Sequence, residues 1–219
     1  MPKTIVALFF SLIVLLFFVH DINAQSVDSI RAKAVYGFKN EEIKVIAQLD
    51  KIDFYEVSFQ KKQLKGNPYI MFSTKEYLKG KMIKNEELYP AEIAKKYYKF
   101  KNIDSNTKIT LTTRPKGDSV TFLYNILGQA LPRTYKRLVS NDYSLRDGLV
   151  TDEAFKNIAL NTTLPVFAYS LPYNDPKQPG ISYYCAITKN GVQPDKWWDT
   201  YKIPHYIIVE MKIITEERL

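Results

Sequence analysis

Cys185 and His205 are the two residues of this chain whose side chains could combine into a nucleophile. They lie in its last two hydrophobic segments, 181–188 and 204–214, where apolar residues alternate as they do in strands. If these strands pair antiparallel with their apolar faces together, both side chains point to one face, and directly opposite Cβ atoms lie about 5 Å apart. A histidine beside a cysteine could lower the pKa of the thiol and supply a reactive thiolate.

The same two residues have a structural interpretation, which we favour. Cysteine in an apolar run behaves as a small hydrophobic side chain, and a single buried histidine can hydrogen-bond to a backbone carbonyl. An exported enzyme that uses Cys185 with His205, or an unidentified hydrolase, is therefore the alternative to a protein without catalytic activity.

Few other residues could carry chemistry. Outside the first 24 residues, His205 is the one histidine and Cys185 the one cysteine, so a zinc site with several such ligands cannot be built. The sequence has no glycine-rich phosphate loop, no G-x-S-x-G elbow and no acidic loop of the EF-hand type. We therefore expect no metal and no cofactor.

Three aromatic residues near the C-terminus are the predicted binding residues: Trp197, Trp198 and Tyr201. They follow Pro194, which can begin a short helical turn, and the first and last of them are spaced to share one side of it. Exposed aromatic rings stack on sugars or contact protein partners. The alternative, which the high average burial of tryptophan favours, is that this segment folds back and its tryptophans fill the core.

Residues 1–24 have the layout of a secretory signal peptide. Lys3 precedes an apolar run at 5–19, and a short polar stretch ends at Ala24. The run is shorter than the roughly 20 residues that cross a bilayer as a helix. We expect cleavage after Ala24, export to a bacterial periplasm or the extracellular space, and a mature chain that does not span the membrane. An uncleaved N-terminal anchor is the alternative.

The net charge of +8 does not indicate a nucleic-acid partner. The basic residues are spread along the chain between acidic residues and tyrosines, with no run of five and no nucleic-acid motif. A positive surface would suit anionic envelope polymers or acidic glycans, but we favour a solvated surface without a charged partner as the explanation of the charge.

In most of the remaining chain, apolar and polar residues alternate with the two-residue period of strands. The expected strands are residues 43–50, 55–60, 69–74, 109–113, 120–126, 166–170, 181–188 and 204–214. Glycines at 66 and 80 indicate turns that join three antiparallel strands as hairpins. Helices are expected at 90–100 and 151–159, a helix or ordered lead-in at 25–39, and loops at 128–148, with at most one short helix, and at 172–180.

These elements predict an α+β, β-rich fold, a two-layer antiparallel sandwich with two or three short helices in a single domain at 25–219. We expect an exported, soluble, non-enzymatic protein of the cell envelope or extracellular space that binds a glycan or a protein partner.

Overall fold

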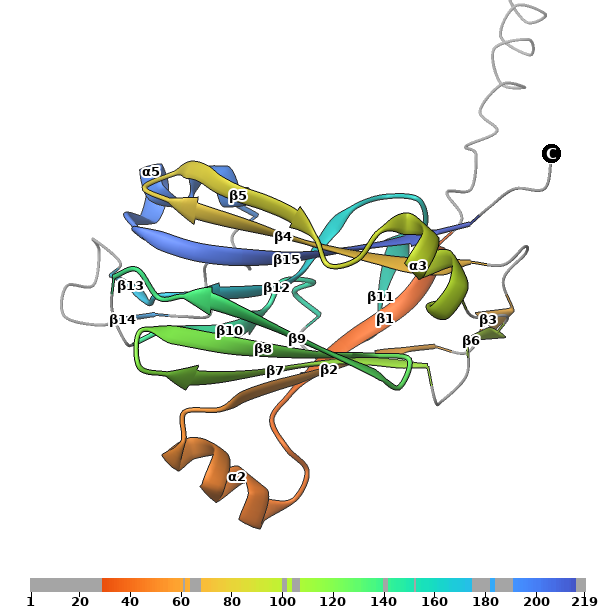
Figure 1. Ribbon diagram of the computed structural model, residues 1–219, viewed down its shortest axis with the longest axis horizontal. Helices are drawn as coiled ribbons and strands as arrows, with labels where there is room; N and C mark the ends of the chain where they lie inside the picture. Colours follow the sequence, from red (N-terminus) through yellow and green to blue (C-terminus); the bar gives the residue numbers. More distant parts are fainter. Residues whose placement is uncertain are drawn as a thin grey trace, which may run out of the picture.

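Two antiparallel sheets lie face to face and enclose the core (Figure 1). The computed structural model describes residues 29–60, 62–63, 68–99, 102–103, 107–139, 142–151, 153–174, 182–183 and 191–215. The β-rich, sandwich-like α+β fold that the sequence predicts is confirmed. Within the described part of the chain, no helix is both long and apolar enough to cross a membrane.

The first sheet has six strands. In spatial order these are β11 (Lys156–Ala159), β1 (Ser29–Tyr36), β2 (Asp53–Phe59), β7 (Lys108–Lys116), β8 (Ser119–Ile126) and β9 (Gln129–Lys136). The β8–β9 connection is a tight turn at Leu127 and Gly128, which both have positive φ, the geometry of two-residue hairpin loops.

The second sheet has five strands. In spatial order these are β10 (Ser144–Asp147), β12 (Leu164–Ser170), β15 (His205–Ile214), β4 (Tyr69–Leu78) and β5 (Lys81–Glu87). The most hydrophobic strand, β15, is central, and every residue from His205 to Val209 is buried. Its register against β4 runs without interruption from His205 opposite Leu78 to Ile214 opposite Tyr69.

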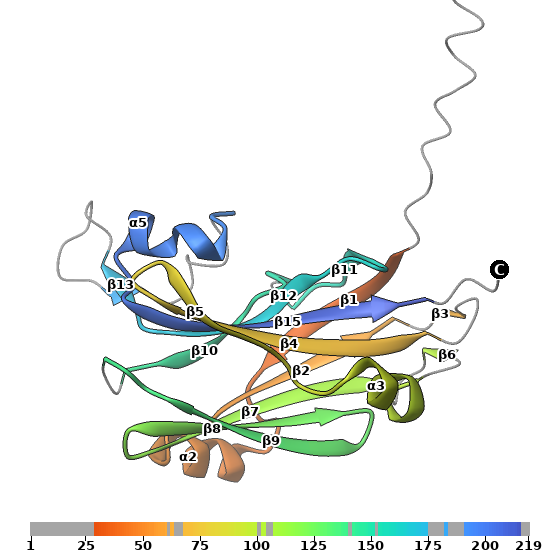
Figure 2. The same ribbon diagram turned by 45° about the horizontal axis from the view of Figure 1, so that its top comes forward.

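Short elements surround the two sheets. Two-residue strands form the pairs β3 (Lys62–Gln63) with β6 (Asn102–Ile103), and β13 (Tyr173–Asn174) with β14 (Ser182–Tyr183). The helices are α2 (Glu41–Leu49), α3 (Ala91–Tyr97), the 3-10 turn η1 (Pro194–Lys196) and α5 (Trp197–Tyr201). Figure 2 shows α3 at one end of the five-stranded sheet and α5 over its outer face at the other.

Several predicted elements are confirmed. The helix after Pro90 is α3, the hairpin predicted from 109 to 126 is β7–β8, and the segments at 166–170 and 204–214 lie in β12 and β15. The turn at Gly80 joins β4 to β5 as a hairpin, with positive φ at Lys79 and Gly80. Of the strand predicted at 181–188, only β14 lies in the described residues.

The N-terminal predictions were wrong. Residues 29–36, expected as a helix or lead-in, form β1, and residues 43–50, expected as a strand, lie mainly in α2. The Asn40 side chain accepts a hydrogen bond from the Ile43 amide at 2.9 Å, and Glu41 and Glu42 lie in the first turn. The Asn40 cap and the attraction between the two glutamates and the helix dipole favour a helix here, although the alternation of apolar residues also suits a strand.

Three further predictions were wrong. The helix expected at 151–159 is replaced by β11, because the Thr151 hydroxyl accepts from the Ala34 amide instead of capping a helix, and Glu153 has positive φ. The loop expected at 128–148 contains β9 and β10, each of which is one of the two edge strands of its sheet. The hairpin expected at Gly66 does not form, because β2 and β4 belong to different sheets.

A buried carboxylate links the two sheets along one edge. Asp53 on β2 accepts hydrogen bonds from the Leu145 amide of β10 at 2.8 Å, from the Tyr36 hydroxyl at 2.9 Å and from the Ser144 hydroxyl at 3.2 Å. Its side chain is thus satisfied from both layers. Unpaired burial of any of these groups would be costly, so Asp53 fixes how the sheets stack at this edge.

Tyrosine hydroxyl groups are unusually common in the core. The buried tyrosines are Tyr55, Tyr69, Tyr77, Tyr89, Tyr98, Tyr124, Tyr135, Tyr143, Tyr169, Tyr173 and Tyr206. Burial raises the pKa of Tyr55 from 10.0 to about 12, and burial together with the Asp53 carboxylate does the same for Tyr36. Burial raises the pKa of Tyr89 and Tyr169 further still.

We predict that Asp53→Asn lowers the free energy of unfolding by roughly 2–3 kcal/mol, because one carboxylate oxygen, which accepts hydrogen bonds, is replaced by an NH2 group that faces the same donors. Urea denaturation measures this change. Asp195→Asn is the matched control, because Asp195 is exposed in a 3.8 Å pair with Lys196, and it should cost less than about 0.5 kcal/mol. Equal effects of the two substitutions would contradict the role of Asp53.

We predict alkaline destabilisation through the buried tyrosines. A folded-state pKa above the unfolded value means that the stabilisation is complete below pH 10 and is lost as the pH rises through about 12. Absorbance of tyrosinate, followed with circular dichroism, should show a first group of tyrosines that ionises in the folded protein and a second group that ionises only with unfolding. A single titration near pH 10 with the fold retained would contradict this.

Candidate functional site

His205 lies at the start of β15, where both nitrogens of its buried ring are hydrogen-bonded. Nε2 lies 2.9 Å from Oε1 of Glu76 on β4, and Nδ1 lies 2.6 Å from the Tyr143 hydroxyl. These partners suit a ring that donates from Nε2 to the carboxylate and accepts from Tyr143 at Nδ1. A tyrosine, a histidine and a glutamate therefore form one chain of hydrogen bonds.

The order of these three hydrogen-bonded side chains resembles that of a nucleophile, a base and an orienting carboxylate in an enzyme, but their burial opposes such chemistry. Burial raises the pKa of Tyr143, so the reactive phenolate is disfavoured. His205 is 0% exposed. The arrangement therefore acts as a buried polar link between β15, β4 and the segment before β10.

The proposed pairing of Cys185 with His205 has no support from the strand order. Both edges of β15 are occupied, by β4 and by β12, while β14 pairs with β13. Cys185 itself lies outside the described residues. The partners of His205 are Glu76 and Tyr143. The sequence suggested neither of them, because both are far from His205 in the chain.

Trp197, a predicted binding residue, is part of the core. It is 2% exposed, and its ring packs against Tyr206 with centroids 5.0 Å apart. Its indole Nε1 donates to the Val192 carbonyl at 2.9 Å. For Trp197, the structure therefore matches the alternative in which this segment folds back into the core, and its ring is not available at the surface.

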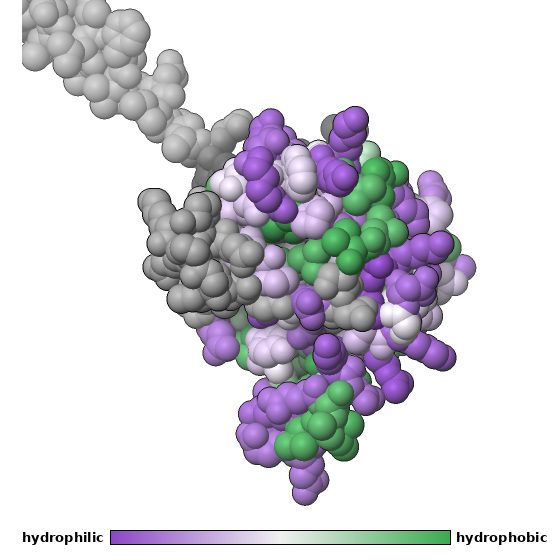
Figure 3. Space-filling model, turned by 90° about the vertical axis from the view of Figure 1, so that its left-hand side faces the viewer, coloured by the Kyte–Doolittle hydropathy of each residue, from purple (hydrophilic) through white to green (hydrophobic). Residues whose placement is uncertain are grey.

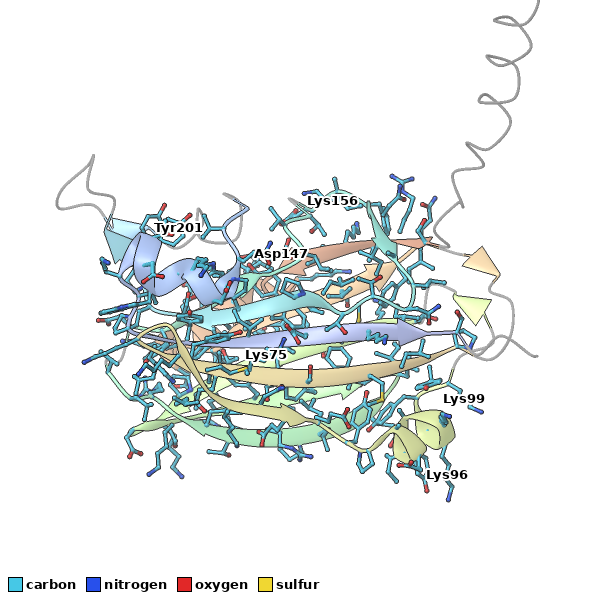
Figure 4. All side chains as sticks on the ribbon, turned by 90° about the horizontal axis from the view of Figure 1, so that it is seen from above. Lys75, Lys96, Lys99, Asp147, Lys156 and Tyr201 are labelled. Atoms are coloured by element: carbon cyan, nitrogen blue, oxygen red, sulfur yellow. The ribbon has the colours of Figure 1, made fainter. Side chains whose placement is uncertain are left out.

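The other two predicted residues are partly buried. Trp198 packs against the β4–β5 turn, where a Cβ on Gly80 would lie 3.1 Å from the Trp198 Cβ, and the Lys202 ammonium lies 5.7 Å from its ring centroid. Tyr201 lies at the end of the sheet (Figure 4), with its ring 4.7 Å from that of Tyr173. A binding role for Trp198 and Tyr201 stays a prediction.

The feature that sequence reasoning missed is helix α2. Ile43, Val45, Ile46 and Leu49 are 46, 57, 60 and 79% exposed, and Ala47 is the one buried residue of the helix. We call these four side chains the α2 surface. Figure 3 shows the helix as a protrusion at the bottom of the view, with a hydrophobic patch on it. The Asn40 cap followed by two glutamates was the signal that could have identified the helix.

The connection that contains α2 is longer than the strands require. The β1–β2 ladder reaches Tyr36 opposite Tyr55, and the Gly37 amide still donates to the Phe54 carbonyl at 2.8 Å. Strands in this register can be joined by two residues. The helix is therefore an insertion in a hairpin, and long insertions that the fold does not need are commonly functional.

A surface hollow of about 520 Å³ lies on the outer face of the same sheet. Its lining residues are Ile52, Thr112, Arg114, Pro115, Lys116, Thr121 and Leu123. Ile52 follows α2 directly, and Arg114 pairs with Asp50 at the end of the helix at 3.3 Å. Apolar, hydroxyl and cationic groups thus continue the α2 surface onto β7 and β8.

The described residues contain no group of three His, Cys, Asp or Glu side chains placed to hold a metal ion. Comparison with protein-family models, with curated proteins and with solved structures found no match for this chain.

We predict that His205→Ala lowers the free energy of unfolding by roughly 2–4 kcal/mol, because it leaves the partly buried Glu76 carboxylate and the buried Tyr143 hydroxyl without their partner. A double-mutant cycle with Tyr143→Phe should give a coupling energy of about 1 kcal/mol. Glu76→Gln, which keeps an acceptor for the ring, is the milder control. Additive effects of His205→Ala and Tyr143→Phe would show that the hydrogen bond does not stabilise the fold.

Proposed function

We propose that the chain is an exported, non-enzymatic protein of the cell envelope or extracellular space that binds a protein partner through the α2 surface. The observation that carries this proposal is the exposure of four large apolar side chains on one nine-residue helix. Exposed apolar side chains that gather on one element are typical of interaction sites.

A protein suits this surface better than a glycan does. Residues 41–49 contain no aromatic side chain that could stack on a sugar ring. Aliphatic side chains on a helix are, in contrast, the common anchors of helix-in-groove and helix–helix recognition. The hollow beside the helix adds the cationic groups of Arg114 and Lys116 at the border of the apolar area, where polar groups set orientation.

Two further observations support a binding role over catalysis and a location outside the cytoplasm. Both ring nitrogens of His205 are engaged by Glu76 and Tyr143, so a neighbouring thiol would find no unpaired base there. The signal-peptide layout of residues 1–24 is the argument for export.

Photo-crosslinking in the native host tests the proposal. A photoreactive phenylalanine analogue at Ile46 should give covalent adducts of discrete mass, and Leu49→Lys in the same chain should remove them. The matched control is the same analogue at Asn125, which is exposed on the outer face of the same sheet.

Leu49→Lys should change the free energy of unfolding by less than about 0.5 kcal/mol, because the replaced side chain is largely solvated. Loss of the adducts then reports on binding and not on folding. Equal labelling at Ile46 and Asn125, or adducts that survive Leu49→Lys, would contradict the proposed function.

A further inference from the structure

A hollow of about 300 Å³ lies on the outer face of the five-stranded sheet, on the opposite side of the sandwich from α2 (Figure 1). Residues of β4, β5 and β15, the start of α3 and the segment before β12 line it. Phe72 on β4 turns toward the core, with its ring centroid 6.2 Å from that of Tyr124 on the other sheet. Successive side chains of a strand point to opposite faces, so Met71 and Ser73 open to the hollow.

Glu87 and Lys212 bring opposite charges to this hollow from the two strands that flank β4. Glu87 on β5 lies opposite Ser73, and Lys212 on β15 lies opposite Met71. Two strand spacings and two residues along β4 therefore separate them, which puts their Cα atoms about 12 Å apart. In the part of the chain that the structure describes, neither side chain forms an ion pair or a hydrogen bond. A small molecule thus fits between the carboxylate and the ammonium.

Other charged groups near the hollow have partners of their own or balance one another. Glu210, on the same face of β15 as Lys212, pairs with Lys75 at 2.8 Å. Glu86 faces the opposite side of β5 and pairs with Lys84 at 2.8 Å. The helix α3, which begins at the hollow, carries one exposed charge of each sign near it, Glu92 and Lys95. Figure 4 shows the further lysines at and beyond the end of α3 pointing away from the sheet, Lys96 and Lys99.

We propose that this hollow binds a free aliphatic α-amino acid, independently of the α2 surface. The ammonium of Lys212 binds the carboxylate of the ligand, and the carboxylate of Glu87 binds its ammonium. Both contacts are charge-assisted hydrogen bonds, which are stronger than those between neutral groups. A zwitterion leaves neither protein charge without a partner, whereas a simple anion would lie against Glu87 and a simple cation against Lys212.

The rest of the lining suits the remaining atoms of such a ligand. The Ser73 hydroxyl donates to Oε2 of Glu210 at 3.4 Å, and its oxygen can still accept a hydrogen bond from the ligand ammonium. The Thr163 hydroxyl adds a second neutral partner. Met71 and Ile214 provide apolar walls, and the flexible thioether of methionine adapts to side chains of different shape. Few precisely placed polar groups against apolar walls are typical of small-molecule sites.

Titration of the purified chain with L-leucine, followed by NMR, tests the proposal. The small, open site should give a dissociation constant of about 0.1–1 mM. Isocaproate lacks the ammonium of leucine and isoamylamine lacks its carboxylate, so each should bind at least about tenfold more weakly. Phosphoethanolamine has both charges but no aliphatic side chain and should also bind at least about tenfold more weakly.

Variants of the two charged residues locate the site. Glu87→Gln and Lys212→Met should each weaken leucine binding at least about fivefold. Glu86→Gln is the matched control, because this neighbour lies on the other side of β5, and it should leave leucine binding unchanged. Leu49→Lys should also leave it unchanged, because α2 lies on the other sheet. Urea denaturation checks that each variant keeps its fold.

Absence of leucine binding, or equal affinity for leucine, isocaproate and isoamylamine, would overturn this inference without any variant. Phosphoethanolamine binding as tight as that of leucine would overturn it in favour of a lipid or metabolite headgroup. Leucine binding that survives both Glu87→Gln and Lys212→Met would place the ligand elsewhere and overturn it too. None of these outcomes bears on the partner of the α2 surface.

Discussion

The antiparallel ladder between β1 and β2 is the constraint on which the account of this molecule depends. It closes with Tyr36 opposite Tyr55, so the two strands already meet before α2 is considered. The rings of Phe38 and Phe54, stacked with centroids 4.6 Å apart, extend the contact to the base of the insertion. The sandwich therefore completes its core through its sheets, and α2 is left outside with its aliphatic side chains in water.

The polar side chains around Asp53 and His205 are hydrogen-bonded to one another inside the fold. Asp53 receives donors from both sheets, and His205 lies between Tyr143 and Glu76. At the opposite edge, Arg133 donates to the Leu88 carbonyl at 2.6 Å and the Tyr135 hydroxyl to Thr74 at 3.3 Å. Such networks fix the stacking of the layers, because a half-satisfied buried network would cost more than an apolar core.

The sequence carries the fold class better than it carries the individual elements. The strand β8 was predicted because its single buried face gives a strong alternation, and β15 because it is a long hydrophobic run, buried on both faces from His205 to Val209. The helix α2 was missed because its apolar residues fall at positions that suit either period, and the cap at Asn40 decided between them. The edge strand β9 was missed because it is largely exposed and contains Pro132, so it lacks the alternation of a half-buried strand.

The candidate sites depended on contacts that no local pattern reveals. Trp197 is buried because η1 and α5 fold onto the outer face of β15, where Tyr206 meets it. The partners of His205 come from β4 and from the segment before β10, 129 and 62 residues away in the chain. Spacing along the sequence can nominate a histidine, but only the order of strands in the sheet decides what lies beside it.

The most direct measurement replaces residues 39–52 with Asn-Gly, which joins Phe38 to Asp53 as a two-residue hairpin. If the core closes without α2, this variant unfolds cooperatively in urea, with a free energy of unfolding within about 1 kcal/mol of the original chain, since shortening a loop costs little. Loss of cooperative unfolding, or a loss of more than about 3 kcal/mol, would show that α2 belongs to the folding core and would remove the reason to regard its surface as a binding site.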